Sequence, residues 1–283
     1  MASEFWRDRL VEILGRRDTE SAVRDELEQV RAYEAMLQGF LPGVQTAGPD
    51  QIELSHPVLG VDGCRAGWVG ALLSPAAPRP RVLVAAQLDS LVEMAREALT
   101  PAVVGIDIPI GLPDSTTRLA DQQARTALPG RSSCVFAAPS RAAIGRETYD
   151  EANAAHRSAT GHGLSRQAWA LAPKIREAES LVHAHPGLRV VEVHPEVAFA
   201  QMTGAPIRAR KKEDEGVSAR LDALASVGLA APSVLSGSGY GPDDVLDACA
   251  AAWTALRVAQ GSAHSLPDPP EVFSDGLPAA IWV

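Results

Sequence analysis

Residues 58–73, VLGVDGCRAGWVGALL, decide the fold that the sequence predicts. Two apolar runs, VLGVD and GWVGALL, flank the turn-rich GCRA, and this pattern predicts an antiparallel β-hairpin. Asp62 closes the first run, where the strand enters the core and a carboxylate is poorly placed for stability. Gly63 and Gly67 keep the neighbouring backbone open to a ligand. Asp62 is therefore either part of an Asp-Gly turn or a functional carboxylate.

Apolar runs and helical repeats continue outward from this hairpin. The expected elements are a strand at 81–87, a helix at 88–99, a strand at 101–109, a largely helical stretch at 116–185 that is broken at 128–140, a strand at 188–195, and helices near 196–203, 213–227 and 242–260. Three antiparallel strands followed by strand–helix units predict an α/β fold, with a mixed five-stranded sheet flanked by helices over about residues 58–260. The tail, EVFSDGLPAAIWV, predicts a final short hairpin around Ser274, Asp275 and Gly276.

The first 57 residues predict a separate helical arm. Residues 3–14 and 19–40 are expected to be helical, and the Pro- and Gly-rich segment 41–57 is typical of a linker. We therefore expect an arm and linker at 1–57 and a main domain at 58–283. The arm could pack on the domain surface, or it could join copies of the chain in a homo-oligomer.

Composition and charge limit the function classes. The chain has 283 residues, of which 46% are hydrophobic and 22% charged, as in folded globular proteins. Its net charge of −9 argues against a protein that coats nucleic acid, but not against an enzyme whose metal ions restore positive charge locally. The three cysteines lie far apart and indicate neither a zinc site nor a disulfide framework. No stretch resembles a signal peptide or a membrane helix, so a soluble, cytoplasmic protein with no membrane partner is expected.

Asp107 ends a second buried run, VVGIDIPIGLP. No polar residue interrupts the run before it, and Pro109 forces an extended exit from the strand. Asp107 could cap the following turn. The end of a central strand is, however, where α/β folds gather their ligands, which favours a functional role.

Glu192 lies inside a third run, RVVEVHPE, on the face opposite Val191 and Val193. It could face solvent from an edge strand, or it could face a site. His194 shares its face and Glu196 follows just beyond the strand. One or more of these three side chains should approach the site, and the sequence does not choose among them.

Acidic residues also open the last long helix, in DDVLDACAAA. Val245 and Cys249 belong to its expected buried stripe, Asp244 lies beside that stripe, and Asp247 lies nearly opposite it. Acidic residues in a first helical turn satisfy its free N–H groups and its dipole. This explanation covers Asp243 and Asp244 better than Asp247.

Carboxylates from distant parts of a chain need a common reason to lie together, and divalent metal binding is the usual one. Two ions can activate a water, position a phosphodiester and stabilise the leaving oxygen. The predicted catalytic residues are Asp62, Asp107, Glu192, Asp244 and Asp247. The predicted ligands of Mg²⁺ or Mn²⁺ are Asp62, Asp107, Glu192 and Asp247.

Basic residues that could bind the substrate lie in two segments. Lys211 and Lys212 belong to the run RARKK, for which a solvated charged loop is the alternative. Arg118 and Arg125 flank Asp121 at helical spacing, either as a surface ion-pair ladder or as a rim that faces the substrate.

Several segments resemble a family of uncharacterised prokaryotic proteins predicted to be RNase H-fold nucleases. They are GVDGCRAGWV, GIDIPIGLP, the Arg118, Asp121 and Arg125 triplet, GLSRQAWALAPKIREAE, VVEVHPE, RKKEDEGVSAR and DDVLDACAAAWTA, in the family's order over about residues 58–260. The resemblance implies the RNase H-like fold and a metal-dependent nuclease that acts on nucleic acid or a nucleotide. DDVLDACAA also resembles the end of Holliday-junction resolvases, which implies metal carboxylates at Asp244 and Asp247. The arm departs from the family pattern.

Other function classes fit less well. Sugar kinases and actin-like ATPases share this fold, but they clamp a nucleotide between two such domains, and 283 residues leave no room for both. Neither the GxSxG elbow of hydrolases nor the GxGxxG fingerprint of dinucleotide-binding proteins is present. The remaining alternative is a non-catalytic binding or regulatory protein that recognises nucleic acid or a nucleotide.

Overall fold

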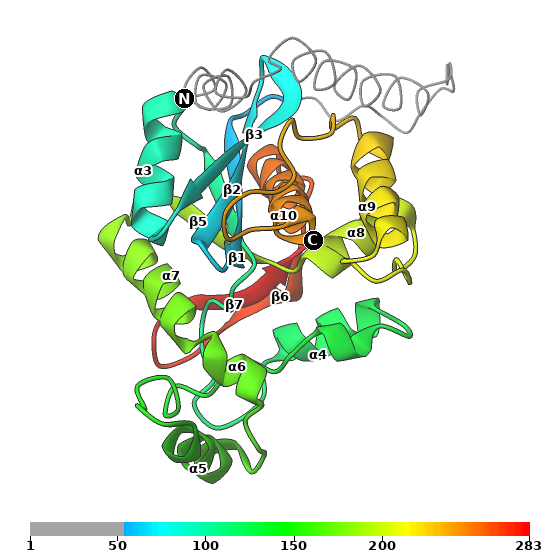
Figure 1. Cartoon of the computed structure of the whole chain (residues 1–283). Coiled ribbons are helices and arrows are strands. Elements are labelled where there is room, and N and C mark those ends of the chain that lie inside the picture. Colours follow the sequence, from blue (N-terminus) through cyan, green and yellow to red (C-terminus); the bar gives the residue numbers. More distant parts are fainter. Residues whose placement is uncertain (1–53) are drawn as a thin grey trace, which may run out of the picture. The chain divides into compact units, whose positions relative to one another are not determined.

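The hairpin begins a mixed sheet of seven strands in the computed structural model, which describes residues 54–283 (Figure 1). The strands are β1 (Val58–Cys64), β2 (Gly67–Ser74), β3 (Ala77–Ala85), β4 (Val103–Ile106), β5 (Arg189–Val193), β6 (Ser265–Val272) and β7 (Pro278–Trp282). The arm predicted at 1–57 falls almost wholly outside the described residues, so its helices, the domain division and the homo-oligomer stay predictions.

The strands lie in the order β3-β2-β1-β4-β5-β7-β6. β1, β2 and β3 pair antiparallel, whereas β4 runs parallel to β1 and β5 runs parallel to β4. The predicted α/β class with a mixed sheet is therefore confirmed. Because these three strands are parallel neighbours, the carboxyl ends of β1, β4 and β5 lie side by side at the same end of the sheet.

The predicted count of five strands is wrong, because the tail hairpin is part of the sheet. β7 pairs in parallel with β5 at Glu192 and Val193, and β6 adds the outermost strand. β6 contains three prolines, Pro267, Pro269 and Pro270, and proline usually argues against a strand. The three prolines lie in the irregular stretch between the paired residues Leu266 and Glu271 of this outermost strand, so their missing N–H groups remove no ladder hydrogen bond. β5 is consequently an internal strand.

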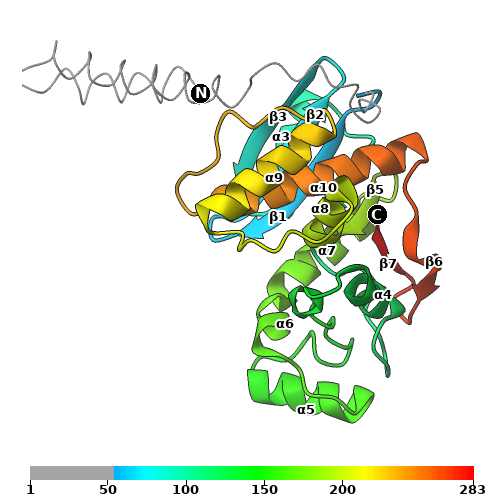
Figure 2. The same ribbon diagram turned by 90° about the vertical axis from the view of Figure 1, so that its right-hand side faces the viewer.

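Helices cover both faces of the sheet (Figure 2). They are α3 (Leu88–Ala98), α4 (Leu119–Ala127), the short 3₁₀ helix η1 (Ser132–Cys134), α5 (Tyr149–Thr160), α6 (Arg166–Ala170), α7 (Ala172–Ala184), α8 (Pro195–Thr203), α9 (Asp214–Ser226) and α10 (Pro242–Gln260). Alternate residues of β1 serve the two sides: Val58 packs with α10, whereas Leu59 and Val61 pack with α3 and α7. Within residues 54–283, no helix is both long and apolar enough to cross a membrane.

α10 lies unusually close to the sheet. A Cβ atom placed on Gly60 of β1 would lie 2.1 Å from the carbonyl oxygen of Ala248, and one on Gly105 of β4 would lie 2.7 Å from that of Ala251. Glycine on the strands and alanine on the helix therefore allow the two backbones to touch.

The expected single stripe on α10 is wrong, because the sheet, α8 and α9 together surround the helix. Residues 245–256 are all buried. Asp247, predicted to lie nearly opposite the stripe, is only 3% exposed.

Candidate functional site

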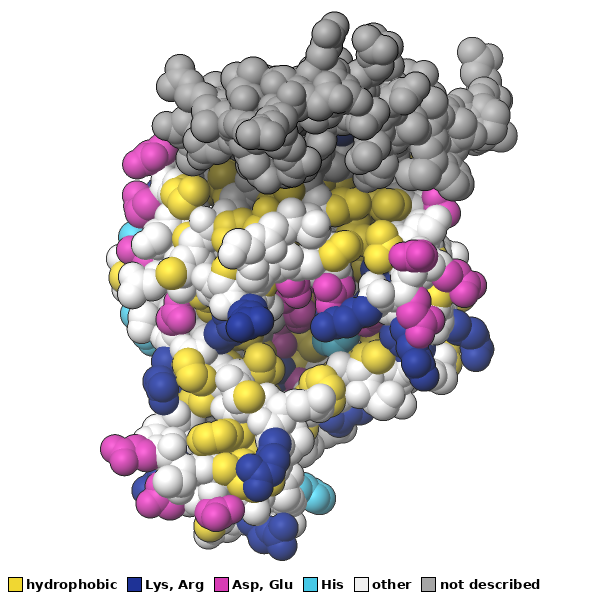
Figure 3. Space-filling view, in the orientation of Figure 1, with side chains coloured by type: hydrophobic (Ala, Val, Ile, Leu, Met, Phe, Trp, Pro, Cys, Tyr) yellow, Lys and Arg dark blue, Asp and Glu magenta, His cyan; other side chains and the backbone are white. Residues whose placement is uncertain are grey.

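A cavity of about 530 Å³ lies at the carboxyl ends of β1, β4 and β5. Asp62 from β1, Asp107 directly after β4 and Asp247 from α10 all line it. The backbone N–H of Asp107 donates to the carbonyl of Val61 at 2.9 Å, and both aspartates directly follow the last parallel pair of neighbouring strands, Val61 and Ile106. The predicted strand end at Asp62 is wrong, because β1 continues to Cys64 in its pairing with β2, whereas β4 ends just before Asp107. Figure 3 shows acidic side chains in a hollow that has basic side chains on either side.

The three aspartates occupy an environment that disfavours their charge. Burial, followed by the charges of Asp107 and Asp247, raises the pKa of Asp62 well above its usual value. Burial raises the pKa of Asp107 to about 7 and that of Asp247 to about 6, although Lys211 opposes both shifts. Added positive charge would therefore stabilise this group of carboxylates.

Lys211 supplies part of that charge. Its Nζ donates to Oδ2 of Asp247 at 2.8 Å and lies 3.8 Å from Asp243. The other oxygen of Asp247, Oδ1, is buried and has no hydrogen-bond partner within the described chain. Lys212 lies outside the cavity, with a side chain that is 80% exposed. Of the two lysines predicted to bind substrate, only Lys211 lines the cavity.

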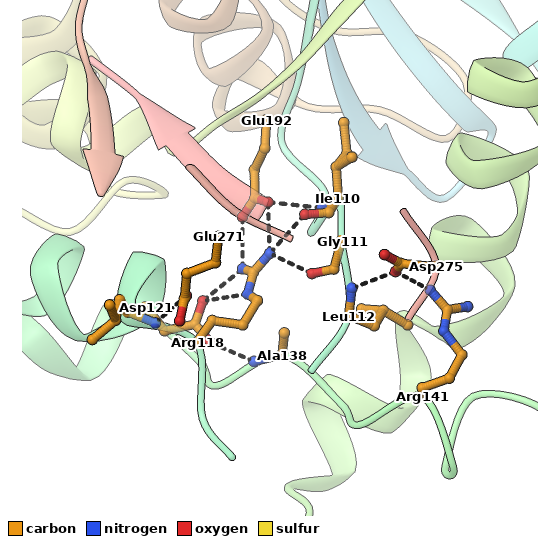
Figure 4. Close-up of polar contacts among 11 residues, drawn as sticks. Ile110, Gly111, Leu112, Arg118, Asp121, Ala138, Arg141, Glu192, Glu271 and Asp275 are labelled. Carbon is orange, nitrogen blue, oxygen red and sulfur yellow. Dashed lines mark hydrogen bonds and ion pairs between the residues drawn. The ribbon is translucent and has the colours of Figure 1, made fainter. Parts of the chain in front are cut away.

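Arg118 and Glu192 lie in the cavity wall and bind each other (Figure 4). Nη1 of Arg118 donates to Oε2 of Glu192 at 2.7 Å, and Nη2 donates to Oε1 at 2.8 Å. Nη2 also donates to Asp121 at 2.6 Å. Arg118 is only 1% exposed, so the surface ladder considered for it does not form there. Glu192 is 5% exposed on an internal strand, which excludes the solvent-facing edge position.

This charged group also fixes the wall of the cavity. Oε2 of Glu192 accepts from the backbone N–H of Ile110 at 2.7 Å, and Asp121 accepts from that of Ala138 at 2.9 Å. The contacts connect β5, the segment after β4, α4 and the segment 128–140, and Figure 4 shows them converging on Arg118. Arg125, predicted to face substrate, donates instead to the carbonyl of Val135 at 3.1 Å and does not line the cavity.

Asp244 caps the first turn of α10. Its Oδ2 accepts from the backbone N–H of Gly241 at 2.9 Å, and the side chain does not line the cavity. The helix-capping explanation therefore describes Asp244, as the sequence allowed. Asp247, which that explanation covered less well, is the aspartate of α10 that reaches the cavity.

Glu196 and His194 both line the cavity and each leaves one buried atom unpartnered. Oε1 of Glu196 accepts from Arg220 at 2.5 Å, whereas Oε2 has no hydrogen-bond partner among the described residues. Nδ1 of His194 is likewise free of protein partners there, and burial lowers the pKa of this imidazole. Of the three candidates in RVVEVHPE, Glu192 is occupied by Arg118, while Glu196 and His194 keep an atom for a ligand.

Lys174 on α7 is a cavity residue that was not predicted from the sequence. Its side chain lines the cavity, lies 4.1 Å from the ring centroid of Trp68 and donates to the carbonyl of Gly67. Burial is the largest influence on its ammonium group and lowers its pKa. The available signal was its place in GLSRQAWALAPKIREAE, one of the segments that carried the family resemblance.

Side chains in residues 54–283 form no ready-made metal site, in the sense of three or more His, Cys, Asp or Glu residues grouped for coordination. A metal bound at the aspartates would therefore require their side chains to turn toward one another.

Comparison with protein families gives one match. The model of a family described as protein of unknown function (DUF429) matches residues 60–272, which include every cavity residue discussed above. No curated protein and no solved structure matches the chain.

Proposed function

We propose that this chain, which belongs to the DUF429 family, is a metal-dependent nuclease on an RNase H-like fold. The observation that carries the proposal is the meeting of Asp62, Asp107 and Asp247, from three separate elements, in one cavity. Carboxylates that are buried and mutually repelling are costly unless a cation or a proton neutralises them. Groups with raised pKa values that converge in a cleft are typical of functional sites.

The topology supports the fold assignment. Three antiparallel strands, β1 to β3, are followed by the parallel strands β4 and β5, which is the arrangement implied by the family resemblance. The cavity lies beyond the carboxyl ends of β1, β4 and β5, where open α/β sheets bind their ligands. The β6–β7 hairpin extends this arrangement beside β5.

The donor set fits Mg²⁺ or Mn²⁺. These hard cations prefer carboxylate oxygens, and Oδ1 of Asp247 and Oε2 of Glu196 are buried without a partner in the described chain. We therefore assign Asp62, Asp107 and Asp247 as ligands, with Glu196 in place of Glu192, whose two oxygens bind Arg118.

The residues of the chain have separable roles in this mechanism. Bound metal would activate a water and stabilise the leaving oxygen of the phosphodiester. The aspartates would hold the cation, and Lys211, beside Asp247, balances charge at the edge of the site. Neutral His194 can accept a hydrogen bond from the attacking water at Nδ1. The Arg118 network keeps the wall at 128–140 in place.

A cleavage screen tests the proposal. Labelled DNA, RNA and hybrid oligonucleotides would be incubated with the chain and Mg²⁺, Mn²⁺ or EDTA. We expect metal-dependent cleavage that Asp62→Asn abolishes and that Asp222→Asn, a matched change at an exposed aspartate, leaves intact. Hydrolysis by Asp62→Asn at the wild-type rate would show that Asp62 serves only as a residue of strand β1.

A non-catalytic nucleotide- or nucleic-acid-binding protein is the second candidate. It is favoured by the ion pair between Lys211 and Asp247, which neutralises one carboxylate without metal. Calorimetric titration with Mg²⁺ and Mn²⁺ separates the two, because the nuclease requires metal uptake that Asp62→Asn and Asp247→Asn remove.

A further inference from the structure

The basic side chains of the cavity differ in whether they are paired. The five that line it are Arg118, Arg131, Lys174, Arg210 and Lys211. Four form ion pairs: Arg118 with Glu192 and Asp121, Arg131 with Glu196, Arg210 with Glu213, and Lys211 with Asp247 and Asp243. Within residues 54–283, Lys174 has no carboxylate partner. Its positive charge is therefore available to a ligand.

Lys174 is held in place by uncharged groups. Its ammonium donates to the carbonyl of Gly67 and lies over the ring of Trp68, in a cation–π contact at 4.1 Å. Gly63 leaves room for its stem, since a Cβ there would lie 2.8 Å from Cδ of Lys174. Gly63 directly follows Asp62, so the ammonium is positioned at the edge of the carboxylate group.

The start of α7 lies on the same side of the cavity as the ammonium of Lys174. Lys174 lies in the first turn of a 13-residue helix, and the residue before that helix, Leu171, also lines the cavity. The N-terminal end of a helix carries partial positive charge and favours anions. This effect is small here, because Leu171 is also the residue at which α6 ends and Pro173 has no N–H to donate. The charge of Lys174 is therefore the main positive feature of this region.

We infer that Lys174 binds an anionic group of the ligand, and that this group is a phosphate held next to Asp62. The identity of the anion rests on the proposed function. A lysine suits the position because a mobile point charge can follow a phosphate through a reaction, whereas a bidentate arginine would fix one geometry. Lys211 lies beside Asp247, so the two lysines approach the carboxylates from α7 and from the segment before α9.

Titration with inorganic phosphate, followed by calorimetry in Mg²⁺ and in EDTA, tests the inference directly. Lys174→Met keeps an apolar stem over Trp68 and removes the charge. We expect at least a tenfold loss of phosphate affinity, corresponding to about 1.4 kcal/mol. Arg176→Met, an exposed basic residue two positions further along α7, is the matched control and should bind phosphate as the wild type does.

Two further variants keep the test decisive if Lys174→Met folds poorly. Lys174→Arg should retain measurable phosphate binding because it retains the charge. Gly63→Ala should weaken binding because the added methyl group displaces the lysine stem. The inference is overturned if Lys174→Met binds phosphate like the wild type, or if the wild type binds no phosphate in either condition.

The test of phosphate binding by Lys174 and the test of nuclease activity can succeed or fail independently. Phosphate titration measures binding alone, so a chain without hydrolytic activity can still support the role of Lys174. In a chain that cleaves oligonucleotides, Lys174→Met should raise KM more than it lowers kcat. An unchanged KM would overturn the inference while leaving the nuclease proposal intact.

Discussion

Replacing Asp247 with asparagine should stabilise the metal-free protein at neutral and alkaline pH. Burial raises the pKa of this carboxyl group from 3.8 to about 6, with Lys211 opposing the shift. A carboxyl group with a raised pKa makes folding less favourable as pH rises from the unfolded to the folded pKa. The rise of roughly two units corresponds to about 3 kcal/mol once both states are ionised. Asparagine has no charge to bury, so the variant avoids this cost.

The measurement is thermal unfolding of wild type and Asp247→Asn in EDTA at pH 4 and pH 8. At pH 8 the variant should be more stable by up to about 3 kcal/mol, which for a chain of this size raises Tm by about 6–12 °C. At pH 4 the difference should nearly vanish. Added Mg²⁺ should stabilise the wild type and not the variant, because only the wild type retains the full set of ligands.

A second buried aspartate provides the opposite control. Asp121 is 1% exposed and is paired with Arg118 at 2.6 Å. Removing one partner of a buried ion pair costs about 3–5 kcal/mol, so Asp121→Asn should destabilise the protein. If Asp247→Asn were also less stable than the wild type at pH 8 in EDTA, Asp247 would serve the fold through Lys211. The raised pKa of Asp247 would then not reflect an unfavourable buried charge that an added cation relieves.

Further substitutions test the surroundings of the site. Arg118→Met should lower the free energy of unfolding by about 3–5 kcal/mol, because Glu192 would remain buried without its cationic partner. Chemical denaturation measures this difference, and a negligible change would show that the Arg118–Glu192 pair does not stabilise the fold. Gly60→Ala should fold less stably and lose cleavage activity, because its methyl group would meet the backbone of α10; wild-type activity would show that α10 can shift without harm. Lys211→Ala should weaken the binding of a labelled oligonucleotide, measured by fluorescence anisotropy. Lys212→Ala should change the affinity by no more than about twofold, because the side chain of Lys212 is exposed outside the cavity. Equal effects of the two substitutions would contradict the placement of the two lysines.

The positions of Asp62 and Asp107 in the site could be predicted from the sequence, because they depend on the local pattern of apolar and turn residues. Asp62 and Asp107 each follow a continuous apolar run of the kind that forms a buried strand, and glycine or proline lies just after each of them. Parallel pairing of two such strands then brings their carboxyl ends together. The predicted strand count was too low because three prolines argue against a strand at 265–272. In the structure these prolines lie in an irregular stretch of the outermost strand, where they interrupt no pairing.

The contacts between side chains that lie far apart in the sequence could not be predicted from local pattern. Arg118 and Glu192 lie 74 residues apart, and nothing local to either states that the arginine will bind both carboxylate oxygens. The same limit applies to Lys174, whose importance depends on which neighbouring charges remain unpaired. Asp247 was expected on the exposed side of the last helix, because the spacing of apolar residues indicated only one buried side. In the structure α10 is covered on several sides, so Asp247 is buried.

The proposed nuclease activity depends on the close approach of α10 to the sheet. Aspartate has a short side chain, so Asp62 on the strand and Asp247 on the helix can share a cation only while the two backbones remain nearly in contact. That spacing is maintained by Gly60 and Gly105, which have no side-chain atoms and take no part in the chemistry. Random mutagenesis should therefore yield folded, inactive proteins with bulkier residues at these glycines, and a search restricted to polar residues would overlook them.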